Sequence, residues 1–390
     1  MMSVPFPSAL IRYERLRRNW SQDGLCEGIC AVSYLSKIEQ GKAEPSEEIL
    51  SALMKRLDLE WHGDEEAQEA RKLLDELEEA CFSLNLVQRE QLMERLKQKR
   101  TVYLNGPHML DVLLLERLGW GNEPADVQDL CAFEECFTQK QRAIWLMVQK
   151  RFEEAIQLLP IADTYMESGY MAYYNGQYTH ATERLLQACS LAAEEGRARV
   201  LLYARMLLGN CYSDQGDYDA MNRHYQAALR LATDLGDEGA KESIRYNIVA
   251  TQVQLGMYEK AYREYMSMDS DYPMLLHKLA VCQEQIGLKE EALQTLDRVD
   301  VLAHDNDDPN DQWAKRMCNL VRYRLEHPDY LKEAAYGAML LIMYQDMQKE
   351  LSNGYALFHQ RWVEEWYVAN RQYKQAYELK RKSNFPSNNM

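Results

Sequence analysis

Two sets of polar side chains in this 390-residue sequence have the spacing to recognise another molecule without covalent chemistry. In the first set, Ser33 and Lys37 are four residues apart and would share one face of a helix. A lysine ammonium can donate to the O6 and N7 acceptors of guanine, and the neighbouring Val32 can touch a thymine methyl group. These residue types predict a surface that reads base edges in double-stranded DNA.

The helices that must present these side chains are predicted within the segment from Ser21 to Ser46. Ser21 is a good N-cap for a short first helix, and Gly28 begins a tight turn. A second helix is predicted from Ala31 to Gln40, with Gly41 ending it in the C′ position. Apolar residues three apart are expected to form the buried edge of this helix: Val32, Leu35 and Ile38.

The start of the second helix predicts the residues that reach base edges: Ala31, Val32, Ser33, Tyr34 and Lys37. Three other polar residues are better placed for phosphates: Gln22, Ser36 and Lys42. Gln22 also lies at a helix N-terminus, where backbone amides attract anions. The alternative is a helical hairpin whose polar face is merely solvated.

Flanking helices are expected on both sides of this motif. The first runs from Leu10 to Trp20, with Leu10, Tyr13 and Leu16 inward and the arginines outward. The second follows the cap Ser46, from Glu47 to Leu57. Residues 1–62 are therefore expected to form a small DNA-binding domain.

The composition favours an all-α protein with an ample core, because 46% of residues are apolar and only 10 are proline and 18 glycine. No apolar stretch has spanning length, and the N-terminus lacks the apolar segment of a signal peptide. These features predict a cytoplasmic protein that does not bind membranes.

The formal charge of −16 is concentrated outside the N-terminal domain, since residues 1–61 carry eight basic and nine acidic residues. A nearly neutral DNA-binding domain makes few phosphate contacts, so we expect a homodimer. The aromatic stretch from Phe358 to Tyr377, with Trp362, Trp366 and Tyr367, is a candidate interface. The alternative is that it forms the core of the last helices.

Motifs for catalysis or metal binding are not found. The sequence has no P-loop, no G-x-S-x-G motif and no carboxylate pair with acid–base spacing. Nine cysteines occur without C-x-x-C spacing, and the histidines are scattered. We therefore expect no enzyme activity, no metal site and no cofactor, with most cysteines in the core.

A repeated phrase, Gly-x-aromatic-x-x-small, organises the second half of the sequence. It begins at Gly176, Gly216 and Gly256, with weaker copies from Lys150, Gly287 and Arg371. This is the tetratricopeptide (TPR) pattern, in which small residues allow two helices to touch and aromatic residues lock neighbouring pairs. Because successive intervals of 40 residues exceed the usual 34 or so, two loops are expected to be enlarged, near Gly196 and Gly236.

The second set of polar side chains lies on the first helices of these repeats, which line the concave surface of a TPR array. The residues expected there are Tyr170, Tyr173, Tyr174, Tyr203, Met206, Asn210, Ser213, Asp214, Asn247, Ala250 and Gln254. Asn210 and Asn247 are expected at matching positions, where amides could hold an extended peptide backbone. Alternatively, the asparagines are ordinary TPR packing residues and the tyrosines are contacts between repeats.

The pattern Arg-x-x-Arg…Ser-Gln-x-x-Leu…Ser-x-x-Ser-x-Ile-Glu-x-Gly-x-x-x-Pro-Ser resembles the Xre/Cro-type helix-turn-helix. Its short turn at Gly28-Ile29-Cys30 resembles more narrowly the PlcR and NprR regulators of the RRNPP group of peptide-pheromone receptors. The resemblance implies an all-α chain in which a helix-turn-helix precedes a right-handed TPR-like α-solenoid. It divides the chain into residues 1–62, a helical connector at 63–138 and a peptide-binding array at 139–390.

That resemblance also implies a function. A short signalling peptide would bind in the groove through an asparagine ladder and control transcription from a DNA operator, as in quorum sensing. An alternative is a Rap-like or NprR-like protein that binds a phosphorelay response regulator on the helices between Glu65 and Phe137. A TPR scaffold that senses no peptide is the other alternative.

Overall fold

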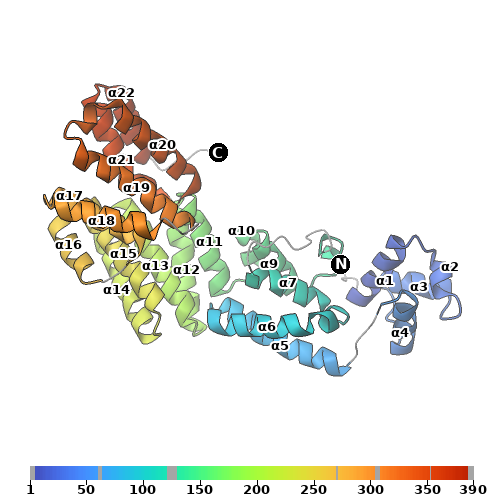
Figure 1. Cartoon of the computed structure of the whole chain (residues 1–390). Helices are drawn as coiled ribbons and strands as arrows, with labels where there is room; N and C mark the ends of the chain where they lie inside the picture. Colours follow the sequence, from blue (N-terminus) through green and yellow to red (C-terminus); the bar gives the residue numbers. More distant parts are fainter. Residues whose placement is uncertain are drawn as a thin grey trace. The chain divides into compact units, whose positions relative to one another are not determined.

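The computed structural model describes residues 5–59, 64–120, 130–268, 271–303, 308–351 and 353–384. Within these ranges all regular structure is helical, so the expected all-α class is confirmed (Figure 1). The chain divides into two compact units, residues 1–168 with 187–200 and residues 169–186 with 201–390. None of the described helices is both long and apolar enough to cross a membrane.

Short turns join most of the helices. In the first half of the chain the helices are α1 Phe6–Arg17, α2 Gln22–Cys26, α3 Val32–Glu39, α4 Glu47–Arg56, α5 Asp64–Phe82, α6 Leu86–Leu104, α7 Met109–Trp120, the 3-10 helix η1 Glu134–Cys136, α9 Gln139–Val148, α10 Phe152–Leu158, α11 Ala162–Tyr174 and α12 Tyr178–Glu194. In the second half they are α13 Ala198–Gln215, α14 Tyr218–Asp234, α15 Glu238–Gln254, α16 Tyr258–Met266, α17 Pro273–Gln285, α18 Lys289–Leu302, α19 Pro309–Glu326, η2 Tyr330–Lys332, α20 Ala334–Glu350, α21 Asn353–Ala369 and α22 Tyr373–Asn384.

The helix-turn-helix forms from the local signals in the sequence. The Ser21 hydroxyl accepts a hydrogen bond from the Gly24 amide at 3.0 Å, and Ser46 caps α4 in the same way through Ile49. Gly28 and Gly41 have φ values of +71° and +69°, which glycine adopts without steric cost. These turns set the spacing between α2, α3 and α4.

Three expectations for this domain were wrong. Leu16 is 53% exposed and Val32 is 40% exposed, whereas both were placed on buried edges. Arg15 was placed outward but is buried, because its guanidinium forms a bidentate ion pair with Glu39 of α3. The buried face of α1 consists of Phe6, Ser8, Leu10, Ile11, Glu14 and Arg15.

The helices after this domain pack as hairpins. The expected connector, α5, lies against α6 and α7 and buries Leu73, Leu74 and Leu77 between them. Two rings of α1, Phe6 and Tyr13, meet Phe133 with centroids 5.5 and 5.1 Å apart. Apolar contacts therefore join α5 to α6 and α7, and they join α1 to the segment around Phe133.

Each copy of the repeat phrase begins with a residue in the left-handed region, where one helix ends and the next begins. The φ values lie between +59° and +85° at Lys150, Gly176, Gly216, Gly256, Gly287 and Arg371. A C′ residue in this conformation reverses the chain within two or three residues. The repeat phrase therefore marks the turn between the helices of a pair.

The expected enlargement of two loops was wrong. The helices α12 to α15 are 17 or 18 residues long, and only three residues separate α12 from α13 and α14 from α15. Gly196 and Gly236 are further left-handed turn residues, with φ of +71° and +65°. The long repeat interval is therefore produced by longer helices.

The aromatic stretch near the C-terminus is mainly core. Phe358, Trp362 and Trp366 pack against the buried cluster formed by the C-terminal helices of the second unit. A Cβ atom added to Gly337 would lie 2.1 Å from the Trp366 ring, so the glycine allows α20 and α21 to approach closely. Tyr373 and Tyr377 of α22 remain exposed.

Candidate functional site

The first candidate surface is the exposed start of α3. Leu35 and Ile38 are fully buried and anchor this helix, while Ser33 and Lys37 project into solvent from its other face. Ala31, in the N-cap position, provides no side-chain cap, so the first-turn amides are not occupied by it. The exposed residues on this surface are Ala31, Val32, Ser33 and Lys37, with Tyr34 and Ser36 partly exposed.

A buried polar network fixes α3 relative to α1 and α2. Arg15 donates from Nε and a terminal nitrogen to the Glu39 carboxylate at 2.6 and 2.9 Å, and it also donates to the Trp20 carbonyl. Gln22, expected at a phosphate, donates to the same carboxylate at 2.8 Å. Glu39 thus joins all three helices of the motif and orients the α3 surface.

The remaining polar residues of this surface have contacts within the domain. Tyr34 donates its hydroxyl to the Glu44 carbonyl at 3.0 Å, which ties α3 to the segment that follows it. Ser36 accepts from Gln40 at 3.1 Å, and Lys42 donates to the Gln40 side chain at 2.8 Å. Among the predicted polar residues, Ser33 and Lys37 are exposed, and neither side chain forms a hydrogen bond or ion pair with another described residue.

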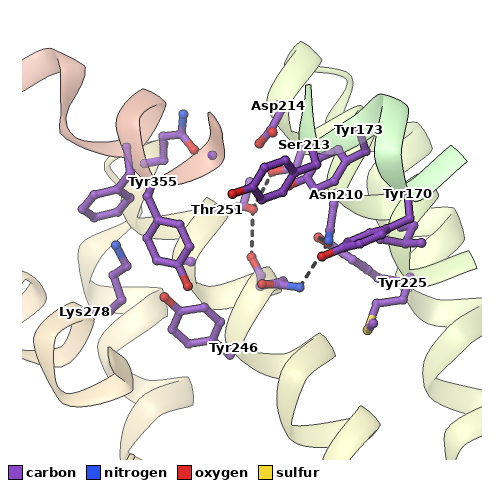
Figure 2. A pocket seen from close by; sticks show the side chains of 18 residues that line it. Tyr170, Tyr173, Asn210, Ser213, Asp214, Tyr225, Tyr246, Thr251, Lys278 and Tyr355 are labelled. Atoms are coloured by element: carbon purple, nitrogen blue, oxygen red, sulfur yellow. Dashed lines mark hydrogen bonds between the residues drawn. The ribbon is translucent and has the colours of Figure 1, made fainter. Parts of the chain in front are cut away.

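The second candidate site is a groove of about 360 Å³ within the second unit (Figure 2). We call it the groove. It is lined by Tyr170, Tyr173, Tyr174, Met206, Leu207, Asn210, Ser213, Asp214, Tyr225, Tyr246, Asn247, Ala250, Thr251, Gln254, Lys278, Gly354, Tyr355 and Phe358. Most of these residues lie on the first helices of successive pairs, α11, α13, α15 and α17.

The structure brings together ten of the eleven residues expected on the concave surface. The exception is Tyr203, whose hydroxyl donates to Asp237 at 3.5 Å and which does not line the groove. It lies near the start of α13, one helical turn before Met206. The repeat pattern therefore predicted the residues of this groove, apart from Tyr203, which was wrongly included.

Asn210 is held in place by its neighbours. Its Oδ1 accepts from the Tyr225 hydroxyl at 2.6 Å and from Asn247 Nδ2 at 3.1 Å. The Tyr225 ring lies over Gly209, where an added Cβ would be 2.3 Å from it. Because these contacts occupy the amide oxygen, the Asn210 Nδ2 donors remain to face the groove.

The two asparagines were expected at matching positions of the repeat, and this expectation was wrong. Asn210 precedes the turn glycine Gly216 by six residues, whereas Asn247 precedes Gly256 by nine. They are thus about one helical turn out of register. Side chains staggered in this way can bond to each other across α13 and α15, and this is the observed contact.

Asp214 gives one end of the groove its acidic character. Burial raises the pKa of its carboxyl group to about 6, although hydrogen bonds from Tyr178, at 3.0 Å, and Tyr173 oppose the shift. Two adjoining hollows of about 890 and 310 Å³ also have Asp214 and Gln254 in their walls. The space for a ligand therefore extends beyond Asp214 into these hollows.

Some of the lining residues that were not predicted lie on the repeat helices α15 and α17, and others lie on α21. Tyr246 and Thr251 stand beside predicted positions on α15, and the helical period would have found them. Lys278 lies nine residues before Gly287, the same offset that separates Asn247 from Gly256, so the register of the repeat also points to it. Tyr355 and Phe358 belong to α21, which no local pattern relates to the groove.

The comparisons with known proteins agree with this architecture. Residues 11–62 match the family model described as helix-turn-helix. A comparison with curated protein sequences gives no significant match. Solved structures extend the similarity over most of the chain.

A Rap protein crystallised with competence and sporulation factor is 14% identical, with a TM-score of 0.62 over 81% of this chain and 97% of that protein. The apo form of the quorum sensor NprR from B. thuringiensis is 17% identical, with a TM-score of 0.52 over 80% and 99%. NprR in complex with its cognate peptide NprX is 16% identical, with a TM-score of 0.50 over the same shares. This chain is similar in fold to the RRNPP regulators. The RRNPP-like fold confirms the expected helix-turn-helix followed by TPR-like helix pairs.

Proposed function

We propose that this chain is a DNA-binding transcription regulator whose activity is controlled by a short signalling peptide bound in the groove. The observation that carries the proposal is the coexistence of two surfaces in one chain. One is the exposed polar start of α3 in a helix-turn-helix, and the other is the polar groove on the first helices of TPR-like pairs. Each is typical of a recognition site, for DNA and for peptide respectively.

For the DNA surface, the support is the contrast between the two faces of α3. Ser33 and Lys37 are exposed, whereas Leu35 and Ile38 are buried, so the helix can enter a major groove without losing its packing. The network of Arg15, Glu39 and Gln22 keeps the orientation of α3 fixed. Lys37 is the residue that we propose for guanine, with Val32 at a thymine methyl group.

For the groove, the support is its mixture of amides, hydroxyls and aromatic rings. Asn210 and Asn247 can pair with the backbone of an extended peptide, and Tyr170 and Tyr174 are partly exposed for its side chains. Two structurally similar proteins were crystallised with signalling molecules, NprR with its peptide NprX and a Rap protein with competence and sporulation factor. We propose that this groove takes a ligand of the same kind.

We also propose that the chain acts as a homodimer. Of the eight basic residues in the N-terminal domain, Arg15 and Arg18 are paired with Glu39 and Glu14, and Arg56 donates to the Leu25 carbonyl. Fewer cations therefore remain for phosphates than the sequence count suggested. Two copies on adjacent half-sites would double the phosphate contacts.

The experiment that tests this function is a selection of DNA from a randomised duplex pool by the full chain, followed by sequencing. The proposal expects an enriched motif with two half-sites and loss of enrichment on Lys37→Ala. Lys55→Ala, which removes an exposed lysine outside the α3 surface, is the control and should enrich the same motif. Recovery of no motif by the wild-type chain would contradict the DNA-binding function.

A further inference from the structure

Lys278 places an amine in the wall of the groove without an anionic partner among the described residues, and burial lowers the pKa of this amine well below its usual value. Its side chain is 2% exposed, and no described residue forms a hydrogen bond or ion pair with its Nζ. The Nζ atom lies 3.0 Å from the centre of the Phe358 ring, which attracts a cation but accepts no ordinary hydrogen bond. Buried lysines are rare unless they are paired.

Among the described residues that line the groove, none offers Lys278 a free compensating charge. Tyr246 and Tyr355 lie beside it in the groove (Figure 2), and burial keeps both phenols neutral by raising their pKa values. The neighbouring His277 and His359 are fully buried and stacked on each other, and burial lowers the pKa of each. Asp214 is the one acid among the described lining residues, and it is held by Tyr178 and Tyr173.

The register of the repeat places Lys278 at the groove-lining position that Asn247 occupies one pair earlier. Lys278 on α17 has the offset from its turn glycine that Asn247 has on α15, and both line the groove. A lysine held only by packing would gain nothing from facing a polar hollow. Its amine is therefore presented where a ligand can reach it.

We propose that Lys278 binds a carboxylate of the ligand, so that the groove selects short peptides bearing an acidic group at this position. The inference rests on the proposed peptide-binding function and names the chemical class that the groove prefers. The carboxylate can be the C-terminus of the peptide or the side chain of an aspartate or glutamate. In either case the carboxylate favours the protonated amine, which burial alone disfavours, and the charged hydrogen bond between the two groups discriminates strongly.

The test uses three pools of short synthetic peptides of randomised sequence and the full chain as bait, with retained peptides identified by mass spectrometry. One pool has free C-termini and no Asp or Glu, the second has amidated C-termini with Asp and Glu allowed, and the third is amidated and lacks both acids. We expect the wild-type chain to retain peptides from the first or second pool, and few from the third. Enrichment from the first pool places the carboxylate at the C-terminus, and enrichment from the second places it on a side chain.

Lys278→Met keeps the length of the side chain and removes the charge. It should lower retention of the enriched peptides roughly tenfold or more while the melting temperature stays equal or rises. Lys289→Met, at an exposed position of α18, is the matched control and should retain them like the wild type. Equal retention of the third pool by the wild type, or unchanged retention by Lys278→Met, would overturn the carboxylate site while leaving peptide binding in place. Retention of no pool by the wild type would contradict peptide binding itself.

Discussion

Asn247 donates from Nδ2 to Oδ1 of Asn210 at 3.1 Å, and the same oxygen accepts the Tyr225 hydroxyl at 2.6 Å. The two asparagines therefore orient each other before any ligand arrives. Tyr225 is 1% exposed, so its hydroxyl depends on Asn210 for its hydrogen bond. Asn210 thus has a structural contact and a groove-facing amide at once.

This double role predicts what the variant Asn210→Ala does. It should lower the free energy of unfolding by about 1–3 kcal/mol, because the buried Tyr225 hydroxyl loses its acceptor. In a Tyr225→Phe background the same substitution should cost less than about 1 kcal/mol, since both partners are then absent. Urea unfolding of the four proteins measures this, and an equal cost in both backgrounds would show that the hydrogen bond contributes nothing.

The ion pair between Arg15 and Glu39 predicts the stability of the N-terminal domain. Arg15→Met leaves a buried carboxylate without its partner and should destabilise this domain by about 3–5 kcal/mol. Arg71→Met, which breaks an exposed pair with Asp75, should cost less than about 1 kcal/mol. Thermal unfolding followed by circular dichroism compares the two variants, and similar losses would contradict a structural role for the buried pair.

The DNA surface predicts a specific pattern of losses. Lys37→Ala should cost about 1–3 kcal/mol of affinity for the selected site and relax the base preference at one position of each half-site. Gln22→Ala should weaken binding to all sequences alike, because it removes the donor to Glu39 that helps to orient α3. Binding titrations on the selected site and on its single-base variants check both predictions. Full protection of the site in a footprint by the double variant would contradict the proposed contact between α3 and DNA.

The raised pKa of Asp214 predicts a dependence of stability on pH. Because its pKa is about 6 in the fold and near 4 in the unfolded chain, the carboxyl group stabilises the fold at acid pH. That contribution is lost as the pH rises through 6. Relative to Asp214→Asn, the wild type should therefore be more stable at pH 4.5 than at pH 7.5, by up to about 3 kcal/mol in the difference. A difference that is constant between these pH values would contradict the buried titration.

The sequence predicted the turns and the groove better than the burial of individual side chains. The repeat phrase located the left-handed residues from Lys150 to Arg371, because a residue that ends a helix leaves a local signature. Arg15 was misplaced, since its burial depends on Glu39, 24 residues away, and no periodicity shows such a pairing. Phe358 and Tyr355 were not predicted in the groove because α21 reaches it through tertiary packing alone.

We propose that a peptide in the groove controls the affinity of the helix-turn-helix for DNA. The most direct measurement is the dissociation constant for the selected DNA site, with and without a saturating amount of a peptide retained from the pools, for the wild type and Asn247→Ala. We expect the peptide to change the wild-type constant by roughly fivefold or more in one direction, and we expect the change to shrink in the variant, which loses an amide of the groove. The same constant for the wild type with and without saturating peptide would contradict control of DNA binding by the peptide.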